Sequence, residues 1–371
     1  MGTFLVHGAM SEDPVDPEDP RSTLFKRRKR VHLRPMKPAD VARLRLAAQQ
    51  LIEPPEATPA QVVARLGAVQ SQEWFGGGWG LGLRGRTTTA AHVERALADG
   101  AIVRTHVLRP TWHFVAPADL RWMLALTGPR VFAGLAGRHR ELELDPATLR
   151  RARGALERAL AGGTCLGRAE LAEVMRRARV SPDGQRLPHI LMVAELEGLL
   201  SSGPRKGKQF TWALLEERVP AAPGDVPADR DAMVAALAHR YFTTRGPATA
   251  HDFVWWSGLT VGDAPRGVEA LGPALAKVDI DGTAHWMDAA ADVPVHRRAR
   301  QLPLAHLLPN YDEYFIGHRE RGAILARLRA AGRDVEHVAL AGHLLAIDGQ
   351  VVGFWTRAAS TKALTVELEP L

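Results

Sequence analysis

The sequence predicts an α+β protein in which three winged helix-turn-helix modules stand in tandem and a small β-rich domain ends the chain. Two observations carry the prediction. The first is a pattern that recurs along the chain: amphipathic helices, a short strand, a glycine-rich hairpin and a returning strand. The second is a change beyond residue 300, where helical periodicity gives way to short alternating runs. Repeated modules usually build one extended binding surface.

The predicted domain boundaries follow these changes of pattern. We expect a disordered tail over residues 1–36, winged helices over 37–140, 141–228 and 229–300, and the β-rich domain over 301–371. A chain of 371 residues suits several domains rather than one. Its 46% hydrophobic and 24% charged residues are ordinary for a globular protein, so the modules should fold.

The first module is predicted to hold three helices and a hairpin. Its second helix starts at Thr58-Pro59, with proline in the first turn, and runs through Val69. The three glycines at 76–78 should end that helical region. The hairpin joins residues 101–107 to 111–115.

The second module is the clearest copy of the pattern. One helix opens at 167–170, a second spans 187–200, and a hairpin then returns through 209–214. Cations at the tip of this wing are candidates for contacts with DNA phosphates, although wing tips are also simply exposed. These cations are Arg205, Lys206 and Lys208.

The third module is fainter. Helices are predicted over 231–242, 249–256 and 262–271, and a hairpin turns at Asp281-Gly282, a strong two-residue turn signal. The aromatic pair Trp255-Trp256 is interpreted as core of this module, with a base-stacking platform as the less favoured alternative.

The C-terminal domain should contain a strand over 305–309, a helix over 319–330 and paired strands across Asp348-Gly349. Asp312 and Glu313 are adjacent carboxylates, which point to opposite faces if they lie in a strand. We therefore do not expect them to share a catalytic site. Tyr311, Asp312 and Tyr314 are instead expected to order a turn, with Arg319 or Arg321 as ion-pair partners.

The charge balance favours a polyanionic partner, since the formal net charge is +7. Arginine greatly outnumbers lysine, however, and a GC-rich coding bias produces the same excess. The basic run at 26–30 has three interpretations: an arm that grips DNA, a solvated tail, or a stretch upstream of a true start at Met36. The second and third together are favoured over the first.

Composition disfavours several function classes. The single cysteine, Cys165, excludes an intramolecular disulfide and a cysteine-cluster zinc site. The fifteen histidines form no H-E-x-x-H motif, so we expect neither metal nor cofactor. No apolar run approaches the length of a membrane span, and residues 1–10 lack the features of a signal peptide. We expect a cytoplasmic protein, nucleoid-associated in a bacterium, and a monomer.

Residues 66–74, L-G-A-V-Q-S-Q-E-W, are the strongest candidate for chemistry. Gln70 and Gln72 stand two positions apart where the predicted helix runs into the glycines. Within a helix their side chains would point roughly 200° apart. At a fraying helix end, both amides can face one cleft. Taken alone, two such glutamines are more often surface residues of a helix.

Three segments together resemble the AlkZ/YcaQ-type family of winged-helix DNA glycosylases. They are residues 59–79, 105–113 (T-H-V-L-R-P-T-W-H) and 308–313 (L-P-N-Y-D-E), and the resemblance extends over nearly the whole chain from Met36. It implies tandem winged helices around a concave DNA channel and an active site with a Gln-Φ-Gln or Gln-Φ-Asp motif. The first and third motif positions correspond to Gln70 and Gln72, and Ser71 stands where the family has an aliphatic residue.

The chemistry that the resemblance implies suits two amides. Hydrolysis of an N-glycosidic bond needs a water that reaches C1′ as the sugar becomes oxocarbenium-like. A neutral carboxamide cannot take up a full proton, but its carbonyl can orient that water and place a negative dipole beside the cation. This suffices for cationic N7- or N3-alkylated purines, which leave readily. We assign water positioning to Gln72 and support of the sugar to Gln70, and the two roles remain interchangeable.

The hairpin of the first module supplies further candidates for DNA contacts. Alternation places Thr111 and His113 on one face of its returning strand and Trp112 on the other. The structural alternative is that His113 is a hydrogen-bonded strand residue that does not contact DNA. The residues predicted to enter a groove or contact phosphates are Arg104, His106, Arg109, Thr111 and His113.

These observations predict a monofunctional DNA glycosylase of base-excision repair. Its expected partner is double-stranded DNA with alkylated purines, with bulky adducts or interstrand crosslinks as further candidates. No lysine stands near the motif as a nucleophile, so lyase activity is not expected. The alternative is a non-catalytic winged-helix DNA-binding protein, such as a transcriptional regulator, which has no need of two amides at its concave centre. An RNA-binding or scaffold protein is a third class.

Overall fold

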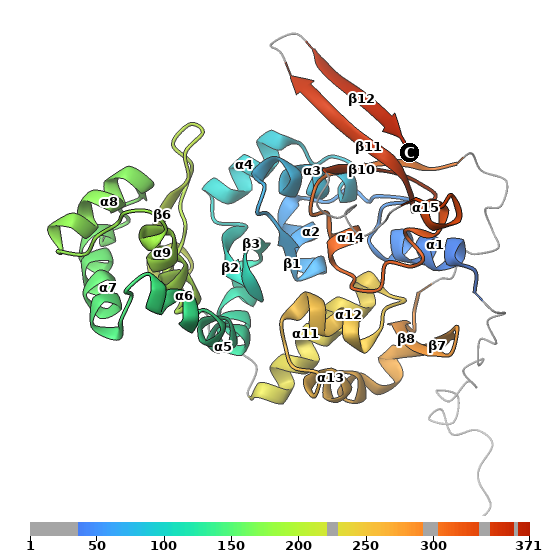
Figure 1. Ribbon diagram of the computed structural model, residues 1–371, viewed down its shortest axis with the longest axis horizontal. Coiled ribbons are helices and arrows are strands. Elements are labelled where there is room, and N and C mark those ends of the chain that lie inside the picture. The colour runs from blue at the N-terminus through green and yellow to red at the C-terminus, as the bar shows by residue number, and fades with distance from the viewer. Residues whose placement is uncertain (1–35, 221–228, 292–302, 334–341, 360–362) are drawn as a thin grey trace, which may run out of the picture. The chain divides into compact units, whose positions relative to one another are not determined.

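The computed structural model describes residues 36–220, 229–291, 303–333, 342–359 and 363–371. The predicted N-terminal tail, apart from Met36, and the basic run at 26–30 lie outside the described residues. The described part of the chain is a mixed α and β structure whose small sheets are all antiparallel (Figure 1). This agrees with the predicted α+β class. None of the described helices is long and apolar enough to cross a membrane.

The first part of the fold surrounds a three-stranded sheet of order β1-β3-β2. Its elements are α1 (Pro38–Ala48), α2 (Pro59–Leu66), β1 (Ala68–Gln70), α3 (Trp74–Arg84), α4 (Ala90–Ala98), β2 (Val103–Val107) and β3 (Arg109–Val115). The predicted hairpin is therefore confirmed as β2 and β3.

The prediction of one helical region from Thr58 to the glycines at 76–78 is wrong. Gly67 ends α2 with φ +81°, a backbone conformation that glycine adopts at no steric penalty. Strand β1 follows, and Glu73 then caps α3 by accepting a hydrogen bond from the Phe75 backbone N–H (3.0 Å). The glycines lie inside α3, where Gly76 and Gly77 let the helix pack closely against its neighbours.

The second part begins with long helices and ends in a small sheet of order β4-β6-β5. Its elements are α5 (Pro117–Gly134), α6 (Ala136–Glu141), α7 (Pro146–Leu160), β4 (Leu166–Gly167), α8 (Arg168–Arg177), α9 (Arg186–Leu196), β5 (Leu200–Ser202), β6 (Thr211–Leu214) and α10 (Leu215–Arg218). Helices α8 and α9 and the returning strand β6 confirm the predicted pattern.

The third part contains three helices and a two-stranded hairpin, as predicted. They are α11 (Arg230–Arg245), α12 (Ala250–Ser257), α13 (Asp263–Leu271), the 3-10 turn η2 (Gly272–Ala274), β7 (Leu275–Ile280) and β8 (Thr283–Asp288). Only one of the two adjacent tryptophans is core: Trp256 is fully buried, whereas Trp255 is 40% exposed.

The C-terminal part forms a four-stranded sheet of order β12-β11-β10-β9, whose long outer hairpin is drawn in red in Figure 1. Its elements are β9 (Ala305–Leu308), α14 (Glu313–Ile316), α15 (Ala326–Ala330), β10 (His343–Ile347), β11 (Gln350–Ala359) and β12 (Leu364–Pro370). The predicted strand pair across Asp348-Gly349 is confirmed. The predicted helix over 319–330 is too long, because α15 begins only at Ala326.

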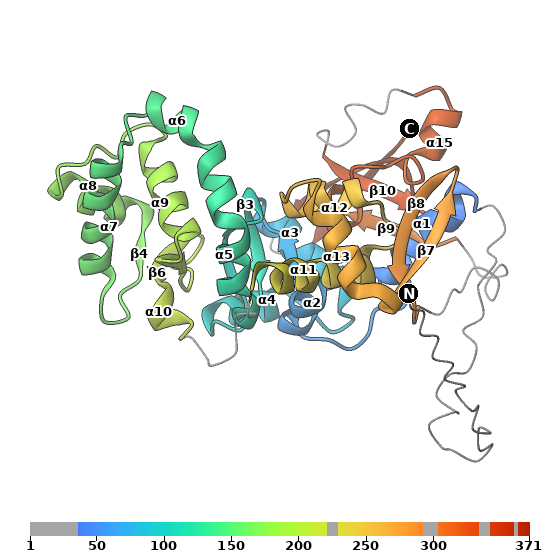
Figure 2. The same ribbon diagram turned by 90° about the horizontal axis from the view of Figure 1, so that it is seen from below.

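The sheet of the first part is buried on both faces, which fixes the position of its strand ends. One face joins the core of α11 and α12, where Ala68 and Val115 cluster with Phe253. The other face joins α2, α3 and α4 through Val69 and Phe114. In Figure 2 this sheet lies between α5 on one side and the α11–α13 helices on the other.

Candidate functional site

The two motif glutamines lie at the end of strand β1. Gln70 is the last residue of β1 and stands directly opposite His113 of β3. The ladder continues one residue further, where the Ser71 N–H donates to the Trp112 carbonyl (2.8 Å). Gln70 is buried, whereas Gln72 is exposed and its Oε1 accepts a hydrogen bond from the Trp112 backbone N–H (3.3 Å). The motif is thus presented by a strand end rather than by a fraying helix.

The three segments that carry the family resemblance meet at this strand end. The Gln70 backbone N–H donates to Glu313 Oε1 (2.8 Å), which joins residues 243 positions apart. Helix α3 lies so close to the third segment that a methyl group on Gly76 would stand 3.1 Å from the Asn310 carbonyl oxygen. Distant parts of the sequence therefore build one site around Gln70.

The Glu313 side chain links the end of β1 to helices α11 and α12. Its Oε2 accepts hydrogen bonds from Arg245 Nη2 (2.6 Å), Arg245 Nε (3.1 Å) and Trp256 Nε1 (3.0 Å), and all three side chains are buried. Burial alone would raise the pKa of the Glu313 carboxyl, but Arg245 and the donated hydrogen bonds lower it below its usual value. The carboxylate is therefore ionised and fully occupied.

The prediction that Arg319 or Arg321 forms the ion pair at the turn of Tyr311, Asp312 and Tyr314 is wrong. Asp312 pairs with the buried Arg84 (Nη2 to Oδ1 2.7 Å) and caps α14, and Glu313 pairs with Arg245. Neither acidic residue lies in a strand. Their structural role agrees with the prediction, but the partners come from α3 and α11, which no local pattern reveals.

His113 lies beneath the surface on the same face of the sheet as Gln70. Its Nδ1 lies 2.9 Å from the Thr111 carbonyl oxygen, and its Nε2 has no hydrogen-bond partner. Burial and the nearby charge of Arg109 lower the pKa of His113 well below its ordinary value. Because a carbonyl only accepts, a neutral His113 carries its proton on Nδ1 and leaves Nε2 with a bare lone pair.

Unpartnered buried polar atoms concentrate around this site. Of the fifteen buried side-chain N and O atoms that lack a partner among the described residues, eight belong to the three converging segments. Buried polar groups normally bond to protein, water or ligand, so this concentration marks the place where such a partner binds. The eight atoms are Gln70 Oε1, Ser71 Oγ, Thr105 Oγ1, Arg109 Nε, Arg109 Nη2, Thr111 Oγ1, His113 Nε2 and Asn310 Oδ1.

The opposite face of the hairpin carries a stack of cationic and aromatic groups. The Arg104 guanidinium lies between the rings of Trp112 (4.4 Å) and Phe210 (4.3 Å), and its Nε donates to the Ser71 carbonyl (3.1 Å). His106 lies against Trp112 with ring centroids 4.3 Å apart. Burial lowers the pKa of Arg104 to about 10, so the side chain stays charged at neutral pH. The stack therefore fixes the backbone between the two glutamines.

Glu195 anchors this stack from helix α9. Its Oε2 accepts a hydrogen bond from the His106 backbone N–H (3.0 Å) and also bonds to His106 Nδ1, and its Oε1 accepts one from Trp212 Nε1 (2.6 Å). The sequence analysis missed both Glu195 and Glu313. The signal for Glu195 was its place as the only charge in the apolar run 190–196.

The wing cations differ in their surroundings. Arg205 pairs with Glu94 of α4 (3.0 Å) and lies over the Trp74 ring (4.8 Å), so its side chain is only 14% exposed. Lys206 and Lys208 are both exposed, and Lys206 Nζ donates to the Cys165 carbonyl (3.0 Å). Arg205 thus ties the wing to the first part of the fold.

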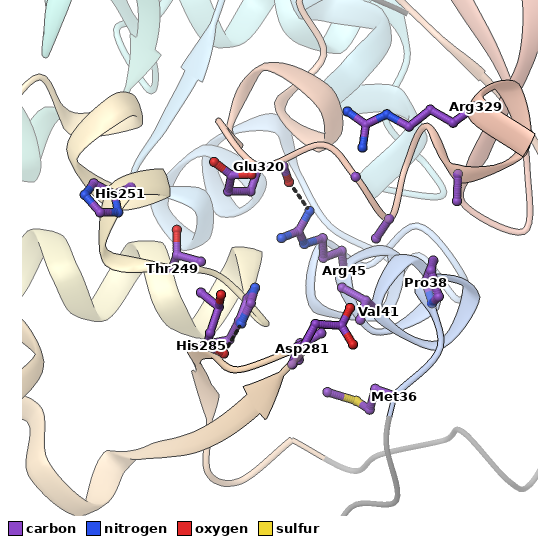
Figure 3. A pocket seen from close by; sticks show the side chains of 15 residues that line it. Met36, Pro38, Val41, Arg45, Thr249, His251, Asp281, His285, Glu320 and Arg329 are labelled. Atoms are coloured by element: carbon purple, nitrogen blue, oxygen red, sulfur yellow. Dashed lines mark hydrogen bonds between the residues drawn. The ribbon is translucent and has the colours of Figure 1, made fainter. Parts of the chain in front are cut away.

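A separate cavity of about 690 Å³ lies between α1, the start of α12, the β7–β8 hairpin and residues 320–329 (Figure 3). Its buried cation, Arg45, already donates to the carbonyls of Pro247 and Glu320 (2.9 Å each). His285 Nδ1 bonds to the Thr283 carbonyl (3.0 Å). The cavity shares no lining residue with the glutamine motif, and its main polar groups are occupied, so we do not take it as the site.

Comparison with known proteins gives the family. The model of the DNA glycosylase AlkZ-like family matches residues 63–371, a span that includes the three segments at the strand end apart from residues 59–62. The chain belongs to this family. An interstrand DNA cross-link repair glycosylase of Streptomyces sahachiroi is 25% identical over 331 residues, which cover 83% of this chain and 84% of the relative.

A solved member of the family has the same fold. The structure of the Streptomyces sahachiroi DNA glycosylase AlkZ matches this chain with a TM-score of 0.69 and 22% identity, covering 91% of this chain and 92% of that one. The predicted family is therefore confirmed, and with it the assignment as a DNA glycosylase.

Proposed function

We propose that this DNA glycosylase is monofunctional and releases cationic N7- or N3-alkylated purines from duplex DNA. The observation that carries the proposal is the paired carboxamides of Gln70 and Gln72 at one strand end, next to buried polar atoms that lack partners. A water or a nucleotide bound there would satisfy those atoms.

The contacts of nearby carboxylates favour a substrate whose base already leaves readily. Both oxygens of Glu73 cap α3, Asp312 is held by Arg84, and Glu313 is bound by Arg245 and the Gln70 N–H. All three carboxylates are thus engaged in structural contacts, and we assign none of them as a general acid for the leaving base. A positive charge on the purine is then the property that makes it leave.

The same contacts favour an exchange of the predicted glutamine roles. The carbonyl of Gln72 already accepts the Trp112 N–H (3.3 Å), whereas the carbonyl of Gln70 has no partner. We therefore assign to Gln70 the negative dipole that orients water beside the oxocarbenium-like sugar, and to Gln72 the contact with the backbone of the nucleotide.

Several finer features belong to the same proposal. We interpret α7–α9 with β4–β6, and α11–α13 with β7–β8, as two of three winged helices, the first part of the fold being the third. The exposed Lys208 and Lys206 are the wing cations that would meet phosphates, and the protein acts as a monomer on nucleoid DNA. The name of the cross-link repair relative supports bulky adducts as further substrates.

The residues at the site support the proposal that the protein lacks lyase activity. The three converging segments contain no lysine, so none of them supplies an amine that could form a Schiff base with the sugar. The expected product is therefore an intact abasic strand.

The test is a panel of duplexes that carry N7-methylguanine, N3-methyladenine or uracil. Free base is quantified by mass spectrometry, and the DNA strand is analysed with and without alkaline cleavage. We expect release of both methylated purines, no release of uracil, and strand breaks only after alkali. Release of uracil at a similar rate would contradict the leaving-group argument, and tight duplex binding without any release would favour the regulator.

A further inference from the structure

Gln70 and His113 form an unusual cross-strand pair. They are directly opposed in the antiparallel ladder, so their side chains share one face and their Cβ atoms lie about 4.5–5.5 Å apart. Gln70 Oε1 and His113 Nε2 are both buried without a partner. In this conformer two acceptors therefore face the same side of the sheet, and neither receives a hydrogen bond.

Rotation of the Gln70 carboxamide removes this conflict. The oxygen and the NH₂ group of a glutamine have nearly the same shape, so a 180° turn about the last bond exchanges them without moving other atoms. The exchange places a donor on the face of the sheet that also carries the bare Nε2 of His113. It also places the carbonyl oxygen where the amide nitrogen now lies, and that nitrogen is not among the buried unpartnered atoms.

We propose that His113 is a positioning residue for Gln70: its Nε2 accepts a hydrogen bond from the carboxamide NH₂ and turns the carbonyl oxygen outward to the sugar. This inference rests on the proposed function. The orientation matters because the two ends of a carboxamide have opposite polarity. An outward oxygen attracts an oxocarbenium-like sugar and orients a water, whereas an outward NH₂ repels the cation.

The surroundings of His113 keep its ring in the required form. The hydrogen bond from Nδ1 to the Thr111 carbonyl fixes the tautomer, and the positive charge of Arg109 opposes protonation of the ring. The charges of His106 on β2 and Arg245 on α11 act in the same direction. A protonated ring would donate from Nε2 and reverse the Gln70 carboxamide, so the site is built to keep an acceptor there.

Two substitutions at position 113 separate this role from a structural one. In His113→Asn the shorter amide can still donate to the Thr111 carbonyl, but no group remains at the position of Nε2. In His113→Gln the longer amide reaches that position and its oxygen can accept. Ser201→Ala is the matched control, because Ser201 of β5 is also fully buried with an unpartnered hydroxyl and belongs to none of the three converging segments.

Single-turnover release of N7-methylguanine at saturating protein gives the first measurement. We expect His113→Asn to slow release about 10-fold or more, equivalent to about one lost hydrogen bond, while duplex affinity and the thermal midpoint stay near native. His113→Gln should recover part of the rate, and Ser201→Ala should be near native. In a Gln70→Ala background, His113→Asn should have no further effect.

Equal losses from His113→Asn in the native and Gln70→Ala backgrounds would overturn the inference, as would an unchanged rate. A second measurement does not depend on activity. In protein labelled with ¹⁵N-histidine, the Nε2 resonance of His113 should shift in Gln70→Ala and remain in place in Gln72→Ala. If the native protein releases no base, the proposed function fails, yet this resonance still decides whether Gln70 and His113 are bonded.

Discussion

Substitution of the two adjacent glycines of α3 separates the packing of the motif from the stability of the helix. A methyl group at Gly77 would stand 2.9 Å from Phe114 Cε2 and 3.0 Å from Ser71 Cβ. Phe114 is fully buried, and Ser71 lies between the two glutamines, so neither can move freely. A methyl group at Gly78 meets only Val93 Cγ1, at 3.9 Å, which is ordinary contact.

The expected magnitudes follow from these distances. Alanine favours a helix over glycine by about 1 kcal/mol, so Gly78→Ala should be stabilised by up to that amount. Gly77→Ala gains the same propensity but overpacks the core, which costs about 1–3 kcal/mol. The Gly77→Ala protein should therefore be about 1–3 kcal/mol less stable than the Gly78→Ala protein.

Urea unfolding of the two variants checks the stability difference, and single-turnover base release checks its consequence at the site. Displacement of Ser71 should slow release by Gly77→Ala about 10-fold, because small misplacements of catalytic groups are strongly felt. Gly78→Ala should release base at the native rate. Equal stability and equal rates in the two variants would refute the claim that α3 holds the motif in place.

Three further results are expected. Glu313→Ala leaves the buried Arg245 without its ion-pair partner and should lose about 3–5 kcal/mol of unfolding free energy. Glu216 pairs with Arg121 (2.9 Å) at the surface, and Glu216→Ala should lose under about 1 kcal/mol; similar losses would contradict the central role of Glu313. Arg205→Ala should increase proteolytic cleavage of the wing at any salt concentration, whereas Lys208→Ala should mainly weaken DNA binding at low salt; the reverse pattern would refute the placement of Arg205. The folded state lowers the pKa of His113, so the unfolded chain binds the extra proton first as the pH falls below about 6.5. The free energy of unfolding should therefore hold above that pH and fall below it, by up to about 1.4 kcal/mol per pH unit. His113→Asn should flatten this part of the stability curve.

Local sequence signals made the second and third parts of the fold predictable. Helices α8 and α9 and the β7–β8 hairpin lie close to where capping residues, apolar periodicity and the Asp281-Gly282 turn placed them. In these segments each local preference agrees with the final structure, so a pattern read within about twenty residues is enough.

The surroundings of the motif were not predictable in this way. Strand β1 has only three residues and follows α2 after the single residue Gly67, so its apolar character read as a continuation of the helix. The partners of Gln70 are non-local. Glu313 follows Gln70 by 243 positions, and Arg245, the ion-pair partner of Glu313, precedes Glu313 by 68 positions. Tertiary packing, which the sequence does not display, decides these contacts.

The most direct test of the account is the release of N7-methylguanine from duplex DNA by the native protein, by Gln70→Ala and by Gln209→Ala. Gln209 is an exposed glutamine on the wing and provides the matched control. The account predicts equal rates of release by the native protein and by Gln209→Ala, and much slower release by Gln70→Ala while duplex binding persists. Native-like release by Gln70→Ala would contradict the claim that the end of strand β1 is the active site.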